Sequence, residues 1–296
     1  MRKILRLLFI VFVLAIVLFA GAAVALVAFF DPNDFKSTMS EQVKEATGRE
    51  LSIEGDLELS LFPWLGVKTG ALTLGNPAGF EKAPFAHVDA AEARAKLLPL
   101  FSGELEMDTV SLQGLELNLV KLRNGKNNWS DLGSKKTGKT ETTEKSASAD
   151  KLAALAIGGV DIQGATITWD DQQARERIEL TDLNLKTGEL ELGAPIPFSL
   201  RTNIKRKSDG MSGLIKASTT LRMNPFEGSY AADGLNLAVN LKGKNLPAKQ
   251  LDAAVRADVV ADLVKQTLSL TNLEASALTL QANGKLNASN ILKNHD

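Results

Sequence analysis

The chain has 296 residues, of which 44% are apolar and 5% aromatic, and its formal net charge is −1. Binding to the phosphates of nucleic acid requires a basic face, so this charge argues against nucleic acid as the main partner. The absence of cysteine excludes disulfides, thiolate nucleophiles and Cys-based zinc sites, and only two histidines are available for catalysis.

The first expected element is a membrane-spanning helix. Residues 7–30 carry no charge, and a helix of that length covers about 36 Å, enough to cross a hydrocarbon core of roughly 30 Å. Three basic residues precede the segment and two aspartates follow it, which keeps the N-terminus cytoplasmic and places the body across the membrane. A cleaved signal peptide is the alternative, but the apolar run continues past both candidate cleavage sites. We therefore expect an uncleaved anchor over residues 1–30, with Leu7, Leu14, Leu18 and Phe30 in the membrane.

A short amphipathic helix is expected next, over residues 31–48. Asp31 can cap this helix, Pro32 suits its first turn and Gly48 can end it. Helical spacing places four apolar side chains on one face, which favours packing on the first strands over a helix that lies on the membrane surface. These side chains are Phe35, Met39, Val43 and Ala46.

From Arg49 onward the hydrophobic period changes from 3.6 to 2, which is typical of strands with one apolar face and one wetted face. The alternation is clearest in residues 57–61, 115–119, 235–241 and 278–283. Residues 81–100 fit either a short helix or a strand that ends at Pro99, and residues 247–266 fit a helix. Turn signals separate the strands, and they lie at Gly75–Pro77, Asn124–Gly125, Asp209–Gly210, Asp233–Gly234 and Asn283–Gly284.

One string imitates a nucleotide site. Gly133–Thr140 matches the P-loop pattern G-x-x-x-x-G-K-[ST]. A P-loop needs a buried strand before it and an amphipathic helix after it, whereas polar residues flank this string on both sides. We therefore expect residues 133–150 to form a flexible polar linker or loop and the chain to bind no nucleotide.

The chain also contains an internal repeat. Val110–Leu119 aligns without gaps with Val160–Trp169, which lies 50 residues further on, and both segments carry a central Gln-Gly pair. A looser repeat relates Leu180–Leu183 to Leu270–Leu273. Repeated units of this size predict a sheet that is extended by stacking similar parts, and the central glycines predict β-bulges or bends.

Few residues have the chemistry of a catalytic site. Asp170–Asp171 has no neighbouring His or Cys, which favours a role in a turn, and His87 stands alone on an expected strand edge. Trp64 and Trp129 are expected to pin strand ends or a turn. Lys205–Lys207 fits a solvated hairpin tip, with a contact to an anionic headgroup as the alternative. We therefore expect no enzyme activity, no catalytic residue, no metal and no cofactor.

Ten short motifs follow one another along the chain, and their order is more specific than any one of them. They are Asn33–Phe35, Ala46–Arg49, Ile53–Leu57, Leu61–Val67, Leu72–Asn76, Gly79–Phe80, Leu97–Leu100, Val110–Leu119, Asn124–Gly125 and Asn127–Trp129. In this order the sequence resembles the N-terminal part of the AsmA family of Gram-negative envelope proteins, densely over residues 1–131 and loosely beyond. Family members are usually considerably longer, and the end of the chain interrupts a strand pattern, so we expect a short or truncated member.

The resemblance implies a single-span inner-membrane protein with a periplasmic β body. The family is similar to the chorein-like bridge proteins, in which a long curved sheet forms a groove with an apolar concave face. We therefore expect a mainly β fold, in which an elongated, curved, repeat-built antiparallel sheet follows the anchor and the short helix. The expected parts are an anchor over 1–30, a first AsmA-like β region over 31–132, a linker over 133–150 and a continuing sheet over 151–296.

The resemblance also implies a function, because family members are associated with outer-membrane assembly and with phospholipid traffic. We expect a non-enzymatic protein that handles or transfers phospholipid along an apolar groove, with the inner membrane, phospholipids and other envelope proteins as partners. The alternative is a scaffold or assembly factor for outer-membrane proteins that acts by protein contacts, because each apolar stripe also fits a closed core between two layers. The candidate lipid-facing residues are Leu117, Ile167, Leu237, Val239, Leu278 and Leu280.

Overall fold

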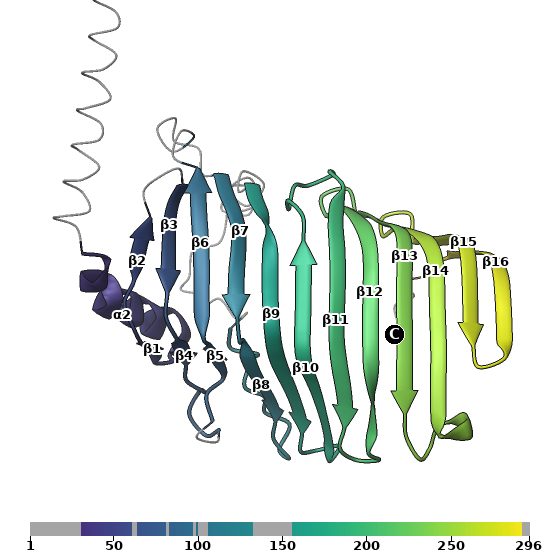
Figure 1. The fold of residues 1–296 in the computed structure, drawn as a ribbon, viewed down its shortest axis with the longest axis horizontal. Helices are drawn as coiled ribbons and strands as arrows, with labels where there is room; N and C mark the ends of the chain where they lie inside the picture. The colour runs from purple at the N-terminus through teal and green to yellow at the C-terminus, as the bar shows by residue number, and fades with distance from the viewer. Residues whose placement is uncertain are drawn as a thin grey trace, which may run out of the picture.

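A computed structural model describes residues 31–60, 64–80, 83–96, 99, 106–132 and 156–291. This part of the chain is mainly β, and sixteen strands form one long sheet with a helix at its N-terminal end (Figure 1). None of the helices in these ranges combines the length and the apolar character that a membrane crossing needs. The expected anchor over 1–30, the linker over 133–150 and the P-loop-like string lie outside the described residues.

The first described element is the predicted short helix. A 3₁₀ turn, η1 (Pro32–Phe35), leads into the α-helix α2 (Lys36–Thr47). The Asp31 carboxylate accepts a hydrogen bond of 2.8 Å from the Asn33 N–H, and Gly48 ends the helix with a φ of 71°, a conformation that costs glycine little. The predicted cap, first-turn proline and terminating glycine are therefore confirmed.

The N-terminal half of the sheet is built from short strands in two ladders, one above the other. Each ladder ends on the long strand β9 (Ala156–Asp171). The lower ladder contains β1 (Leu51–Ile53), β4 (Leu72–Leu74), β5 (Ala86–Val88) and β8 (Glu116–Lys121). The upper ladder contains β2 (Glu58–Ser60), β3 (Trp64–Thr69), β6 (Ala90–Lys96) and β7 (Glu106–Gln113).

The internal repeat becomes a strand register. β7 and β8 both lie parallel to β9, and Val110 is opposite Val160 while Leu117 is opposite Ile167. Every residue pair between β7 and β9, and between β8 and β9, joins residues that are 50 positions apart. The repeat is therefore confirmed as two adjacent copies of one strand pattern, and this junction makes the sheet mixed where the sequence predicts only antiparallel pairing.

Beyond β9 the sheet is a plain antiparallel meander in which each strand pairs with the next. Short connections suffice because antiparallel neighbours can be joined by tight turns. The strands are β10 (Glu176–Thr187), β11 (Ile196–Arg206), β12 (Met211–Asn224), β13 (Ser229–Lys242), β14 (Gln250–Asp262), β15 (Thr267–Ala277) and β16 (Leu280–Ser289).

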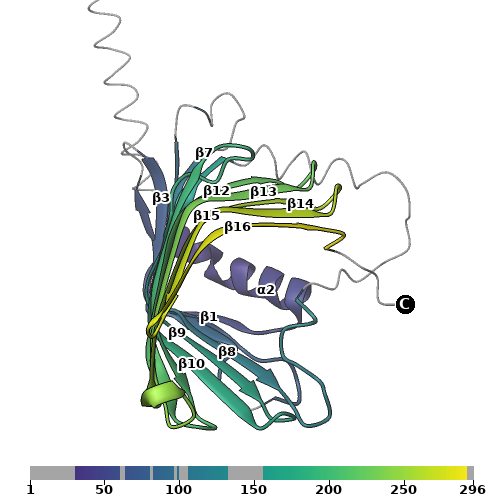
Figure 2. The same cartoon turned by 90° about the vertical axis from the view of Figure 1, so that its right-hand side faces the viewer.

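β-Bulges in the middle of neighbouring strands bend the whole sheet. Gly164, Asp182, Gly234 and Asn272 have positive φ values of 65°, 51°, 60° and 50° inside β9, β10, β13 and β15. The register of the adjacent pairs shifts at the same places. Because a bulge bends its strand and increases its twist, the two arms of the sheet fold toward one another, as the end view shows (Figure 2). The looser repeat, Leu180–Leu183 and Leu270–Leu273, thus marks two of these bulges.

Three sequence predictions are wrong in detail. Residues 247–266 are not helical: a 3₁₀ turn, η2 (Pro247–Lys249), is followed by β14. The apolar side chains at positions 251, 255, 259 and 263 fit both a helix and a period of 2, because the odd positions between them are alanines. Asp233–Gly234 and Asn283–Gly284 lie inside strands, whereas the real hairpin turn is Leu278–Thr279, between Ala277 and Leu280. The open choice over 81–100 resolves to β5 and β6.

Asp258 in β14 is expected to hold two of the bulges. Its carboxylate accepts hydrogen bonds of 2.7 Å from the Gly234 N–H and from the Asn272 amide, and these two donors lower the pKa of Asp258 from its ordinary value of 3.8. Asp258→Ala should therefore lower the melting temperature near neutral pH, because the bulge N–H loses its acceptor.

The pH dependence of this effect follows from the direction of the shift. Because the pKa of Asp258 is lower in the folded protein than in the unfolded chain, its stabilisation is complete above 3.8 and is lost as the pH falls below that value. Thermal unfolding should therefore show wild type and variant converging in acid. Glu274→Ala, which removes only an exposed pair with Arg256 at 3.7 Å, is the control and should change little. A difference that persists unchanged in acid would contradict the assigned role of the carboxylate.

Candidate functional site

One face of the sheet carries an unbroken apolar row across nine strands. Cross-strand pairing places each of its members directly opposite the next, so the row follows from the register alone. The row runs Leu112, Ile162, Leu185, Leu200, Ala217, Leu237, Val255, Ala275 and Ala282. We call the side of the sheet that carries this row the apolar face, and the opposite side the polar face.

A second apolar row lies on the same face, on the other arm of the sheet. It begins in β8 and ends in β14, beyond the line of bulges, and its members are again direct cross-strand neighbours. The row runs Leu117, Ile167, Leu180, Ile204, Gly213, Leu241 and Leu251. The two rows give each arm an apolar lining.

The apolar face is the concave side of the bent sheet. At the bend its side chains are shielded by their neighbours: Ala165 is 0% exposed, Leu183 6%, Thr202 2% and Ala257 3%. In a single-layer sheet only the inner side of a bend can enclose side chains in this way. Helix α2 also lies on the inner side, between the two arms (Figure 2).

Away from the bend the apolar face remains accessible. Leu185, Leu200 and Leu237 are only half-buried, and few apolar side chains of the described residues are buried at all, namely Leu57, Phe85, Val88, Ala165, Leu183, Ile196 and Ala257. No second layer of described strands covers the rows (Figure 2). A closed two-layer core, the alternative interpretation of the apolar stripes, is therefore not what the described part of the chain forms.

The structure brings five of the six candidate lipid-facing residues to this face. Leu117 and Ile167 are direct partners in the second row, and Leu237 belongs to the first. Val239 and Leu280 lie in a neighbouring row through the pairs Val239–Ala253, Ala253–Ala277 and Ala277–Leu280. The sixth, Leu278, occupies the first position of the β15–β16 turn, with a φ of 56° and 49% of its surface exposed, so it lies outside the rows.

Sequence reasoning missed most of the lining. Leu185 and Leu200 have no special spacing that separates them from other strand leucines, and β14 was assigned to a helix. The signal that would have found them is the register itself, because one confirmed pair in a meander predicts the next pair once the turn lengths are known.

At the N-terminal end a buried arginine ties α2 to the sheet. The Arg49 side chain is fully buried, and its guanidinium donates hydrogen bonds of 2.7 Å to the Asn128 carbonyl and 2.6 Å to the Asp131 carboxylate. It also lies 4.3 Å from the centre of the Phe85 ring, a favourable cation–π distance. These contacts join residues almost 80 positions apart.

Asn128, which is fully buried, continues this connection into the lower ladder. Its amide donates to the Asn76 side chain and to the Asn118 carbonyl, both at 2.8 Å, and its oxygen accepts from the Val120 N–H at 2.8 Å. The next residue, Trp129, packs on Trp169 with 4.9 Å between ring centres. Motif residues that carry the family resemblance but lie far apart in sequence thus meet at one point, where they hold a loop against the apolar face.

Helix α2 packs on the first strand, but part of its apolar side remains exposed. The helix contacts β1, but none of its own residues is buried, and Phe35 and Met39 are 49% and 39% exposed. The expected packing of the helix on the first strands is therefore confirmed for β1, while Phe35, at the end of η1, and Met39 remain partly exposed. They add exposed apolar surface at the end of the concave side.

The remaining candidate residues make local contacts within the sheet and its turns. The Asp171 carboxylate accepts from the Ala174 N–H at 2.8 Å and contacts Lys121, and these donors lower its pKa, as expected of a turn residue. The His87 ring nitrogen Nδ1 is 2.8 Å from the Thr73 hydroxyl. Within the described ranges, no three His, Asp or Glu side chains are close enough together to share a metal ion.

Lys205–Lys207 lies at the end of β11 and forms the predicted hairpin tip with Asp209–Gly210. Arg206 donates to Asp209 at 2.5 and 3.0 Å. This pair and the Met211 N–H lower the pKa of Asp209 to about 2, so the tip is an internally paired, solvated turn.

Comparison with known proteins agrees with the sequence motifs. The family model described as "AsmA family" matches residues 1–295. The chain is 27% identical over 254 residues to "AsmA family protein YhjG" of Escherichia coli (strain K12), and the match covers 79% of this chain and 35% of that protein. It is 33% identical over 108 residues to "Protein AsmA" of the same organism, which covers 36% of this chain and 17% of that protein. The chain thus spans about a third or less of the length of these relatives.

Proposed function

Because the chain belongs to the AsmA family, we propose that it is a non-enzymatic, inner-membrane-anchored protein with a periplasmic body that handles phospholipid along its apolar face in outer-membrane biogenesis. One observation supports the proposal: the apolar row from Leu112 to Ala282 crosses nine strands, and the described residues leave it only partly buried. An apolar surface of this extent is rarely left uncovered on a soluble domain without a binding role.

The geometry suits hydrocarbon tails. Burying apolar surface stabilises in proportion to its area, by about 25 cal/mol per Å², so a uniform lining binds an acyl chain with similar strength at each position. A lipid that moves along the rows exchanges one apolar contact for another and meets no deep trap. The charged headgroup can remain in water, because no second layer of described strands closes the concave side.

A second candidate function, scaffolding of outer-membrane proteins, has support at the C-terminal edge. Among the described strands β16 pairs only with β15, and most of its side chains are exposed. An unpaired strand edge can accept a strand of another protein by β-augmentation. This candidate predicts protein contacts at β16 and makes no use of the apolar rows.

A photo-crosslinking amino acid at Leu237 separates the two candidates. The matched control is the adjacent position, Asn236, which lies on the polar face of the same strand. We expect lipid adducts by mass spectrometry at position 237 and none at 236, with the same contrast between Leu280 and Gln281. Adducts with proteins alone at 237 and 280 would contradict lipid handling and favour the scaffold.

A further inference from the structure

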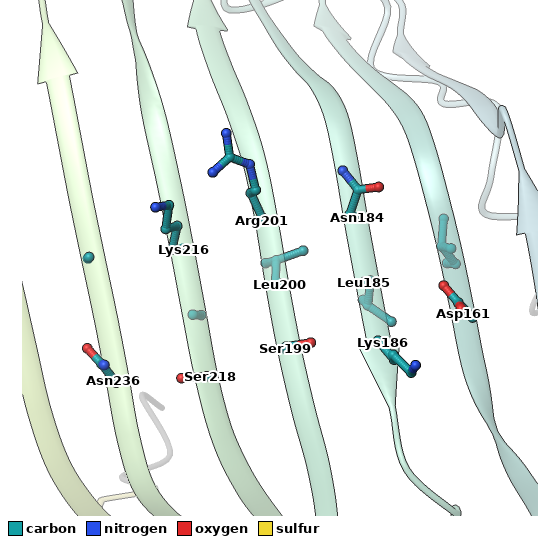
Figure 3. Close-up of a pocket in the computed structure, with 13 residues that line it drawn as sticks. Asp161, Asn184, Leu185, Lys186, Ser199, Leu200, Arg201, Lys216, Ser218 and Asn236 are labelled. Atoms are coloured by element: carbon teal, nitrogen blue, oxygen red, sulfur yellow. The ribbon is translucent and has the colours of Figure 1, made fainter.

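The polar face carries a group of cations without ion-pair partners. Lys186 in β10, Arg201 in β11 and Lys216 in β12 are all exposed, and among the described residues none of the three forms a salt bridge. We call these three residues the basic cluster. They lie on neighbouring strands near the middle of the sheet (Figure 3).

Strand register places two cations of the basic cluster directly opposite one another and the third in a diagonal position. Arg201 and Lys216 are direct cross-strand partners. Lys186 is opposite Ser199, which is two residues from Arg201 on the same strand and face. Like charges directly opposite one another destabilise a sheet, so this arrangement has a cost in the free protein that a bound anion would remove.

Elsewhere on the polar face the arginines are neutralised. Arg222 pairs with Asp233, Arg177 with Glu179 at 2.9 Å, and Arg256 with Glu274 at 3.7 Å. One acid, Asp161, is directly opposite Lys186. Its carboxylate accepts from the Gln163 amide at 3.3 Å and makes no salt bridge with that lysine.

The basic cluster borders a shallow pocket of about 400 Å³. The other polar side chains of its lining come from β9 to β13 and are the carboxylate of Asp161 and the hydroxyls and amides of Asn184, Ser199, Ser218 and Asn236. The hydroxyls and amides point to the same side as the cations (Figure 3). A guanidinium with two ammonium groups and neutral hydrogen-bonding groups is the donor set that binds phosphate oxygens well.

We propose that the basic cluster binds a phosphate group, carried either by a free phosphate compound or by an anionic lipid headgroup. The site lies on the opposite face from the apolar rows, so it does not depend on the proposed lipid handling. A tail held on the concave side could not place its own headgroup there.

The test uses the full chain in neutral detergent and pyrophosphate as the probe, titrated by calorimetry. The triple variant K186Q/R201Q/K216Q should bind pyrophosphate at least tenfold more weakly than wild type. The matched control K68Q/K126Q/K285Q removes the same charge from exposed lysines that also lack a salt bridge, and it should bind as wild type does. Equal weakening in both variants, or none in the first, would overturn the site.

Two further measurements identify the source of the phosphate. Mixed micelles that contain phosphatidylglycerol or phosphatidylcholine are added to the pyrophosphate complex. Displacement by phosphatidylglycerol but not by phosphatidylcholine indicates that the site binds a lipid headgroup. If neither lipid displaces pyrophosphate, the site binds a soluble phosphate compound. Either result supports the phosphate site. If polyglutamate competes as effectively as unlabelled pyrophosphate, the phosphate site is overturned. The surface would then recognise any negative charge, including that of an acidic protein.

The melting temperature distinguishes an anion-binding role of Lys216 from a purely structural one, because the two roles predict changes of opposite sign. Lys216→Gln should raise the melting temperature in anion-free buffer, because it removes the repulsion from Arg201, and it should weaken pyrophosphate binding at the same time. A lower melting temperature would show that the lysine stabilises the sheet and would contradict the assignment.

Discussion

Replacing Arg49 with alanine is expected to lower the free energy of unfolding by about 3 kcal/mol, the low end of the range for breaking a buried ion pair. The guanidinium is fully buried, while its partner Asp131 is 42% exposed and can be rehydrated, which keeps the loss from being larger. The Asn128 carbonyl would lose its donor and the Phe85 ring its cation. Urea unfolding of the full chain measures the change.

The control for this prediction is Arg123→Ala, because Arg123 is exposed and makes no salt bridge among the described residues. Its effect should remain within about 0.5 kcal/mol. Arg49→Lys should recover part of the loss, since both hydrogen bonds come from the single nitrogen Nη2 and an ammonium is also one nitrogen with three donors. An Arg49→Ala variant as stable as wild type would show that the contacts between α2 and the 128–131 loop do not hold this end of the sheet.

Replacing Leu237 with glutamate is expected to reduce the phospholipid that copurifies with the protein at least tenfold, which corresponds to about 1.4 kcal/mol of binding free energy. A carboxylate in the apolar row would have to be desolvated against an acyl chain, and an unpaired charge pays heavily for that transfer. The folded protein should tolerate the change, because Leu237 is only half-buried and the charge can reach water when no lipid is bound.

Asn236→Glu is the matched control, since it adds the same charge to the same strand on the polar face. Lipid extraction and mass spectrometry should find wild-type amounts of phospholipid with this variant. Thermal unfolding must accompany both measurements. If Leu237→Glu unfolds the protein, the row is structural core; if it folds and retains its lipid, the apolar face is not the lipid site.

Local structure was predictable where neighbouring residues determine it. Asp31, Pro32 and Gly48 delimit the short helix because capping, a fixed proline φ and a left-handed glycine act within a few residues. The alternation in residues 235–241 predicts a strand with one apolar face because successive side chains point to opposite sides. The offset of the 50-residue repeat is also the register in which β7 and β8 pair with β9, so the repeat contains this strand pairing.

The sequence is ambiguous where the same residues fit both the helical period and the strand period. A spacing of four residues satisfies both a helix and a strand, so residues 247–266 were assigned to the wrong element. Asp233–Gly234 and Asn283–Gly284 both favour a tight turn, but Gly234 lies in a bulge with a φ of 60°, and Asn283–Gly284 lies inside β16 without a positive φ. Sequence shows that the chain can bend at such a place and does not show whether the strand continues beyond it.

By itself, then, the sequence determined the helix, the β class, the one-sided strands and the family. The tertiary structure decided which faces line up and which distant residues meet: the apolar rows, the contact between Arg49 and Asn128, and the adjacency of Lys186, Arg201 and Lys216. The physical reason is that cross-strand neighbours depend on register, and register depends on the length of every turn and the position of every bulge between two strands. A shift of one residue in any of them would send the leucines to the polar face and the lysines to the concave side.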